Sequence, residues 1–140
     1  YLAFLTKLAA GRKVEFYTSA SDEEVIALLS SSQCLVLPSV YEDYRGRKQA
    51  LPELVGLVLL EAMACGTAVV CTSAGGMPEI VDQGKTGFIV EPGSSEAVRT
   101  VVARLVEQPE LAKNMGQNAR DDVLRRFTWK GIAQRCLDFY

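Results

Sequence analysis

The chain has 140 residues, of which 49% are hydrophobic and 23% charged, with a formal net charge of −2. This length suffices for one domain with a buried core, and the charge balance lacks the basic stripe that a nucleic-acid partner would require. No apolar run reaches the about 18 residues of a membrane span. Because the chain begins at Tyr1 without a signal-like segment, we expect a cytoplasmic piece of a longer protein.

The sequence contains four cysteines and no histidine. The cysteines have no Cys-x-x-Cys spacing, so we predict no zinc site. The absence of histidine excludes Ser-His-Asp and Cys-His catalysis by this chain. Cys34 and Cys71 lie in apolar runs, where a reduced cysteine packs as a small hydrophobic residue, and this favours a reducing compartment.

The first half of the chain alternates between helix-like and strand-like segments. Leucines at helical spacing predict a helix that ends before Gly11, and Ser21 with the acidic residues after it predicts a second helix ending near Ser30. Short apolar runs predict strands, and the run after Thr67 is apolar throughout, which indicates burial on both faces. The predicted strands of this half are Val14–Tyr17, Cys34–Leu37 and Ala68–Thr72.

The second half begins with a predicted helix between Gly56 and Gly66 and is mostly helical after residue 94. Proline in a first turn predicts a short helix after Gly76, and Phe88–Val90 is predicted as a strand. Apolar residues spaced three and four apart predict the remaining helices. These helices follow Ser94, run from Pro109 to about Arg126, and begin again near Trp129, which we expect to be a packing residue.

This alternation predicts an α/β fold, in which a Rossmann-like parallel sheet carries helices on both faces. In such sheets ligands bind at the carboxyl ends of the strands. The loop from Ser39 to Gly56 follows a predicted strand and leads into a predicted helix, so it occupies the expected position of a binding site.

One carboxylate interrupts the most apolar segment of the chain. Glu61 is the only charge in the thirteen-residue run LVGLVLLEAMACG, Leu54–Gly66. We expect it to be buried, where a carboxylate needs hydrogen-bond donors. A buried carboxylate near a helix N-terminus fits a ligand with an anionic part and hydroxyl groups, and a nucleotide sugar has both.

The segment PELVGLVLLEAMACGTAVVCTSAGGMPEIVDQGKTGFIVEPG, Pro52–Gly93, resembles the family-four retaining glycosyltransferases of GT-B fold. The family pattern is Glu-x-x-Gly-Leu-x-x-x-Glu-Ala-x-Ala-x-Gly, then a buried strand, Gly-Gly, a helix with Glu, and Thr-Gly-Phe. The resemblance extends over nearly the whole chain. The matching residues are Glu53, Gly56, Leu57, Glu61, Ala62, Ala64, Gly66, Gly75, Gly76, Glu79, Gly87 and Phe88.

The resemblance implies a role for each residue of the motif. The N–H groups of Gly56, Leu57 and Val58 would hold the donor diphosphate at a helix N-terminus. Glu61 would bind the ribose hydroxyls. Glu53 would contact the donor sugar and stabilise positive charge at its anomeric carbon, without acting as a nucleophile. Neither a metal nor a cofactor is implied. We interpret Gly75, Gly76 and Glu79 as structural, and Ser21 as a helix cap.

The resemblance also implies that residues 1–140 form an incomplete GT-B C-terminal domain. The first two strands, their basic residues and the N-terminal domain that binds a carbohydrate or glycolipid acceptor would be missing. Val14–Tyr17 would then pair directly with Cys34–Leu37 or remain a poorly satisfied edge. We therefore expect the isolated chain to be inactive, and peripheral membrane association of the full protein stays open.

Two other functions remain open. A sugar-nucleotide epimerase of GT-B fold would share the nucleotide-binding half, although the spacing of Glu53, Gly56 and Glu61 favours a transferase. A non-catalytic sugar-nucleotide-binding subunit is the second alternative. The sequence leaves the base, sugar, acceptor and oligomeric state undetermined. The basic residues of the loop Glu42–Leu51 would either reach an anionic ligand or be balanced by Glu42 and Asp43, and we favour the latter.

Overall fold

The computed structural model describes residues 1–43, 45–48 and 53–139. Within them three parallel strands form one sheet in the order β1-β2-β3, with bounds β1 (Cys34–Leu37), β2 (Ala68–Thr72) and β3 (Gly87–Val90). Cys34 lies opposite Ala68 in the register of the first pair, and Val69 lies opposite Gly87 in that of the second. The predicted strands at 34–37 and 68–72 are confirmed at both ends.

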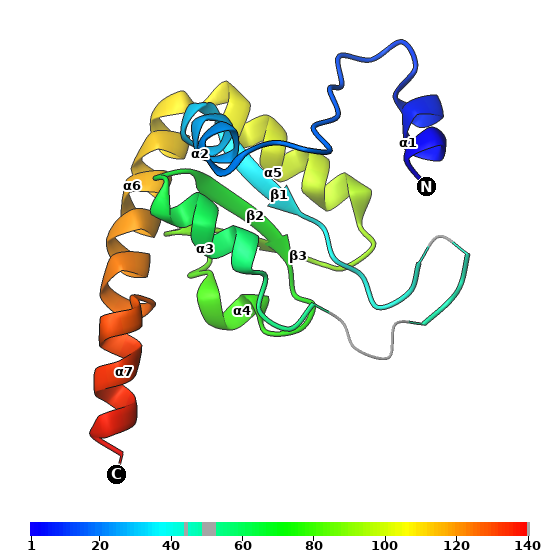
Figure 1. Ribbon diagram of the computed structural model, residues 1–140. Helices are drawn as coiled ribbons and strands as arrows, with labels where there is room; N and C mark the ends of the chain where they lie inside the picture. The colour runs from blue at the N-terminus through cyan, green and yellow to red at the C-terminus, as the bar shows by residue number, and fades with distance from the viewer. Residues whose placement is uncertain (44, 49–52, 140) are drawn as a thin grey trace.

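Helices precede, separate and follow the strands (Figure 1). The second of them starts where the sequence predicts. The Ser21 side chain accepts the N–H of Glu24 at 3.3 Å, and the Glu24 carboxylate accepts the N–H of Ser21 at 2.7 Å. This reciprocal cap satisfies two first-turn donors. The helices are α1 (Leu2–Ala9), α2 (Asp22–Ser31), α3 (Leu57–Ala64), α4 (Met77–Ile80), α5 (Ser95–Glu107), α6 (Pro109–Arg126) and α7 (Trp129–Leu137).

The sheet separates two apolar clusters, one on each face. Every residue of β2 is buried, as its sequence predicts. Val69 and Cys71 belong to the cluster under α2, α3 and α4, whereas Ala68 and Val70 belong to the cluster under α5. Helix α6 contributes to both. Figure 1 shows α3 and α4 on one face and α5 on the other, which confirms the predicted α/β architecture. Burial raises the pKa of the Cys71 thiol to about 11.

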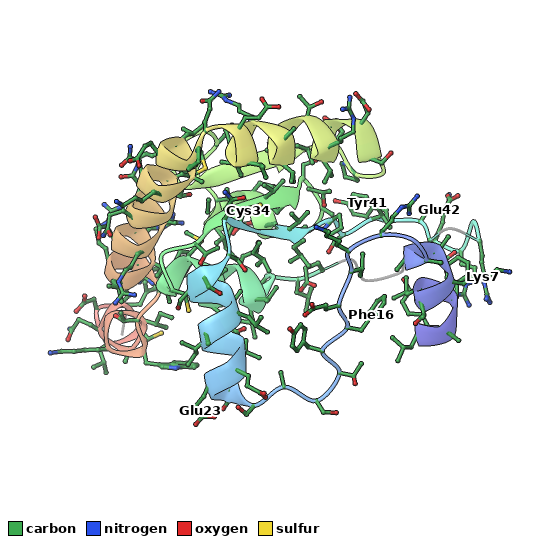
Figure 2. All side chains as sticks on the ribbon, turned by 90° about the horizontal axis from the view of Figure 1, so that it is seen from above. Lys7, Phe16, Glu23, Cys34, Tyr41 and Glu42 are labelled. Carbon is green, nitrogen blue, oxygen red and sulfur yellow. The ribbon has the colours of Figure 1, made fainter. Side chains whose placement is uncertain are left out.

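The strand predicted at Val14–Tyr17 is wrong. These residues form an extended segment without strand pairing, and Val14, Phe16 and Tyr17 are between 41% and 58% exposed. Figure 2 shows Phe16 on this segment, away from the sheet. A short run becomes a strand only when a neighbour pairs with its N–H and C=O groups. The segment therefore neither pairs with β1 nor forms an edge strand.

The open edge of the sheet has a visible effect on β1. All four of its residues are apolar but only half-buried, whereas β2, which lies between two strands, is buried throughout. Among the described residues β1 pairs with β2 alone. The sequential order β1-β2-β3 is that of positions four to six in the strand order 3-2-1-4-5-6.

The last helix differs from the prediction in one respect. Trp129 begins α7 with 88% of its surface exposed, so its predicted packing role is wrong. Figure 1 shows α7 continuing from α6 away from the sheet, and Trp129 belongs to neither of the two apolar clusters in the described residues. None of the helices in the described ranges combines the length and apolar character that a membrane span requires.

Candidate functional site

Three loops meet at the carboxyl end of the sheet, where Rossmann-like folds bind their ligands. They are the segment that follows β1, the residues just before α3, and the turn that follows β2. The hydroxyl of Thr72, the last residue of β2, donates a hydrogen bond to the carbonyl of Ser39 at 2.6 Å. This bond holds the segment leaving β1 against the end of β2.

Gly56 sets the start of α3. It is the N-cap, with φ 72° and ψ 58°, a left-handed conformation in which a side chain is strained. A Cβ at this position would also lie 3.1 Å from the side chains of Leu37 and Leu59. The left-handed backbone therefore favours glycine here, and a larger residue would also crowd these two leucine side chains. The first-turn N–H groups, including those of Leu57 and Val58, have no acceptor inside the helix, and this end of α3 attracts anions.

Glu53 lies next to this helix end. Its half-buried carboxylate accepts the N–H of Gly56 through Oε1 at 3.0 Å. The structure therefore brings together two residues that the sequence assigned to different parts of one ligand. A carboxylate at a helix N-terminus is in a favourable field.

A glycine turn supports the backbone of Glu53 from the end of β2. The N–H of Gly76 donates to the carbonyl of Leu54 at 3.0 Å. A Cβ on Gly75 would lie 1.6 Å from the carbonyl oxygen of Glu53. The structural interpretation of these two glycines is thus confirmed, because a larger residue at 75 would displace the Glu53 backbone.

The expected burial of Glu61 is wrong. Its side chain is exposed, because α3 turns only the face with Leu59, Ala62 and Met63 toward the sheet, and position 61 lies away from that face. Glu61 lines an open groove of about 590 Å³. Its other lining residues come from α2, α3 with its C-cap Cys65, and α6: Asp22, Val25, Ile26, Leu29, Ser30, Ala64, Cys65 and Arg120.

One acidic and one basic residue pair with each other in the described part of the loop after β1. Arg47 forms an ion pair with Asp43 at 2.6 Å, and this hydrogen-bonded guanidinium lowers the pKa of the Asp43 carboxyl. The backbones of Glu42 and Lys48 form an isolated antiparallel β-bridge, which closes the loop without pairing their charges. The ion pair of Arg47 with Asp43 agrees with a self-balanced loop. Residues 44 and 49–51 of the Glu42–Leu51 loop lie outside the described residues.

Across the described ranges, no three His, Cys, Asp or Glu side chains gather in a way that could hold a metal ion.

The structure adds one residue near the site that the sequence did not indicate. Tyr41 accepts the N–H of Gly75 through its hydroxyl at 3.2 Å. No pattern marked Tyr41, because the contact joins residues 34 positions apart.

Comparison with known proteins identifies the family. The family model "Glycosyl transferases group 1" matches residues 3–122. The chain belongs to the group 1 glycosyltransferases. It is 37% identical over 119 residues to alpha-maltose-1-phosphate synthase of Mycolicibacterium smegmatis, an alignment that covers 81% of this chain and 28% of the relative.

Solved structures of related proteins share the fold of this group 1 glycosyltransferase chain. Sucrose-phosphate synthase from Thermosynechococcus elongatus aligns with a TM-score of 0.80 and 29% identity, over 99% of this chain and 32% of that protein. HepE of Anabaena, solved in complex with UDP-glucose, aligns with a TM-score of 0.78 and 25% identity, over 99% of this chain and 36% of that one. The chain thus spans about a third of these proteins, and the predicted GT-B relationship is confirmed.

Proposed function

We propose that the chain supplies the donor-binding part of a retaining glycosyltransferase that uses a nucleoside-diphosphate sugar. The observation that carries this proposal is the start of α3, where left-handed Gly56 presents first-turn N–H groups beside the carboxylate of Glu53. The family assignment supports the transferase class. The UDP-glucose in the related Anabaena structure supports a nucleotide-sugar donor.

In this proposal each part of the donor has its own contact. The diphosphate binds the N–H groups of Gly56, Leu57 and Val58, since the helix end supplies donors and a favourable dipole. The ribose hydroxyls bind Glu61 at the groove between α2 and α3. An exposed carboxylate fits this role, because it remains reachable by a ligand. The sugar then lies beside Glu53.

Glu53 acts in the proposed reaction by its charge. The bond between the anomeric carbon and the diphosphate oxygen breaks, and the acceptor hydroxyl attacks from the same face. Positive charge develops on the sugar ring, and the Glu53 carboxylate stabilises it. The departing phosphate takes the acceptor proton. Loss of one such preorganised electrostatic partner lowers kcat by about 100- to 1000-fold.

The proposal also includes parts that this chain does not supply. A separate N-terminal domain binds a carbohydrate or glycolipid acceptor, and residues 1–140 belong to the C-terminal domain of a cytoplasmic enzyme. Peripheral membrane association of that enzyme would bring it to a glycolipid. The donor site uses helix N–H groups rather than a metal or cofactor, so chelation by EDTA is expected to leave nucleotide binding unchanged.

Thermal unfolding of the chain with nucleotides tests the proposal. A ligand that binds only the folded chain raises its melting temperature. We expect at least one of UDP, GDP and ADP to raise it more than its parent nucleoside does at the same concentration, because the nucleoside lacks the diphosphate. If no nucleoside diphosphate shifts the melting temperature at millimolar concentration, the proposal is wrong.

A second measurement separates transfer from the alternatives. The chain is mixed with a candidate acceptor-binding domain and a nucleotide sugar, and the products are analysed by NMR. The proposal predicts a new α-linked product or slow donor hydrolysis. Recovery of an epimerised nucleotide sugar would instead identify an epimerase.

A further inference from the structure

The backbone at Glu53 is held by two residues from other loops. Its carbonyl oxygen lies so close to Gly75 that an added Cβ would be 1.6 Å away. The next carbonyl, that of Leu54, accepts the N–H of Gly76 at 3.0 Å. The conformation of the Glu53 segment is therefore coupled to that of the turn after β2.

The turn is itself held by Tyr41. The N–H of Gly75 donates to the Tyr41 hydroxyl at 3.2 Å, while Gly75 has φ 58°. In Figure 2 Tyr41 lies beyond the carboxyl end of β1, whose other end is marked by Cys34. A chain of contacts thus leads from the loop after β1, through the turn after β2, to the residue before α3.

We propose that Tyr41 is a positioning residue for Glu53 and acts through Gly75. The hydroxyl fixes Gly75, the Gly75–Gly76 turn fixes the main chain of residues 53 and 54, and this aims the Glu53 carboxylate at the start of α3. The effect of Tyr41 on catalysis rests on the proposed function, because that function makes Glu53 a catalytic residue. The contact itself is a property of the chain without a ligand.

The geometry permits a variant that removes the contact without removing the fold. Tyr41 is 47% exposed and Gly75 is exposed, so in Tyr41→Phe the Gly75 N–H can turn to water. The ring and its packing stay. The loss of this hydrogen bond lowers the equilibrium constant between the positioned and the displaced Glu53 segment by about 2- to 10-fold.

The amide resonance of Gly56 reports the position of Glu53, because Oε1 accepts that N–H. The experiment follows this resonance in the ligand-free chain by ¹H–¹⁵N NMR while the pH is lowered through the range in which carboxylates protonate. Glu53→Gln shows the response that remains without a titrating carboxylate at this position. Tyr17→Phe is the matched control, since it removes a tyrosine hydroxyl that also forms a hydrogen bond, donating to Glu15, on an exposed segment away from the site.

We expect a large pH response of Gly56 in the unaltered chain and in Tyr17→Phe, and a partial loss of this response in Tyr41→Phe, because the positioned fraction of the Glu53 segment falls. The amides of β2 should stay unchanged in all three. A full response in Tyr41→Phe would overturn the inference, and so would a flat response in the unaltered chain. In an assembled enzyme with measurable transfer, Tyr41→Phe is expected to lower kcat and leave KM nearly unchanged.

The result for Tyr41 does not depend on whether the proposed function is correct. The pH response needs no nucleotide, so it tests the positioning contact even if the chain binds none. Conversely, a chain that binds UDP but keeps the full Gly56 response in Tyr41→Phe would retain its proposed function and refute the role of Tyr41.

Discussion

The carboxylate of Glu53 accepts the N–H of Gly56 at 3.0 Å. The proposed function assigns this same N–H to the donor diphosphate, so two anionic groups compete for one helix end. Donor binding then requires the Glu53 carboxylate to turn from Gly56 toward the sugar, while the main chain of residues 53 and 54 stays where Tyr41 and the glycine turn hold it. Without a donor, it satisfies one of the N–H groups that α3 cannot satisfy itself.

This competition should lower the affinity of the chain for a nucleoside diphosphate. Glu53→Gln removes the charge that opposes the diphosphate, and a charge at a helix N-terminus is worth about 0.3–1 kcal/mol. We expect the variant to bind a nucleoside diphosphate about 2- to 5-fold more tightly by calorimetry. Glu79→Gln removes an exposed carboxylate from the first turn of α4 and is the control. Weaker binding by Glu53→Gln would show that Glu53 does not compete for this site.

Glu61 is predicted to recognise ribose. A hydrogen bond to a charged group contributes about 1.5–3 kcal/mol, so Glu61→Ala should lower the affinity for UDP by about 10-fold or more. The same variant should change the affinity for 2′,3′-dideoxy-UDP little, because that ligand lacks the two hydroxyls. Glu107→Ala, on exposed α5 surface, is the control. An equal loss for both ligands would place the ribose elsewhere.

The packing of α6 on the core depends on Gly116. A Cβ there would lie 2.0 Å from the carbonyl oxygen of Gly66, in the turn that connects α3 with β2. Overpacking of this kind lowers the free energy of unfolding by about 1–3 kcal/mol, so Gly116→Ala should lower the urea midpoint. Gly131→Ala is the matched control, because its Cβ would meet only the Thr128 side chain at 3.1 Å among close neighbours. Equal effects of the two variants would contradict this account.

The ion pairs of Asp122 make the free energy of unfolding depend on pH. Burial raises the pKa of its carboxyl, but hydrogen bonds and charges from Arg125 and Arg126 outweigh this, so the pKa lies below its ordinary value. The stabilisation is present above the unfolded value of about 3.9 and is lost as the pH falls through the folded value. The stability difference between the unaltered chain and Asp122→Asn should therefore shrink from pH 7 to pH 3.

The neighbouring Asp121 provides the control for this measurement. It is exposed and accepts a hydrogen bond from Gln117 rather than from an arginine. Asp121→Asn should leave the pH dependence of unfolding nearly unchanged. A difference for Asp122→Asn that stays constant with pH would show that its ion pairs do not respond to protonation in the expected way.

The sequence predicted those parts of the fold that depend on local pattern. Cys34–Leu37 and Ala68–Thr72 were predicted to the residue, because each is an apolar run with a clear boundary. Val14–Tyr17 is also a short run rich in strand-forming residues, but it pairs with no strand among the described residues, and composition alone does not reveal a missing partner. Strand formation at this position is decided by tertiary pairing.

The sequence identified the residues of the candidate site but did not reveal how they contact each other. The motif located Glu53, Gly56 and Glu61, yet the apolar run suggested burial of Glu61, whereas helical periodicity turns it to the surface. The contact of Tyr41 with Gly75 joins two loops 34 positions apart, so no spacing rule could reveal it.

The proposed function depends on binding of a nucleotide diphosphate at the start of α3. A ¹H–¹⁵N NMR titration of the chain with UDP, GDP and ADP, with the corresponding nucleosides as controls, tests this directly. We expect at least one diphosphate to shift the amides of Gly56, Leu57 and Val58, and its nucleoside to leave them in place. If every nucleotide leaves these three amides unmoved while others shift, the donor site lies elsewhere and the proposed function is wrong.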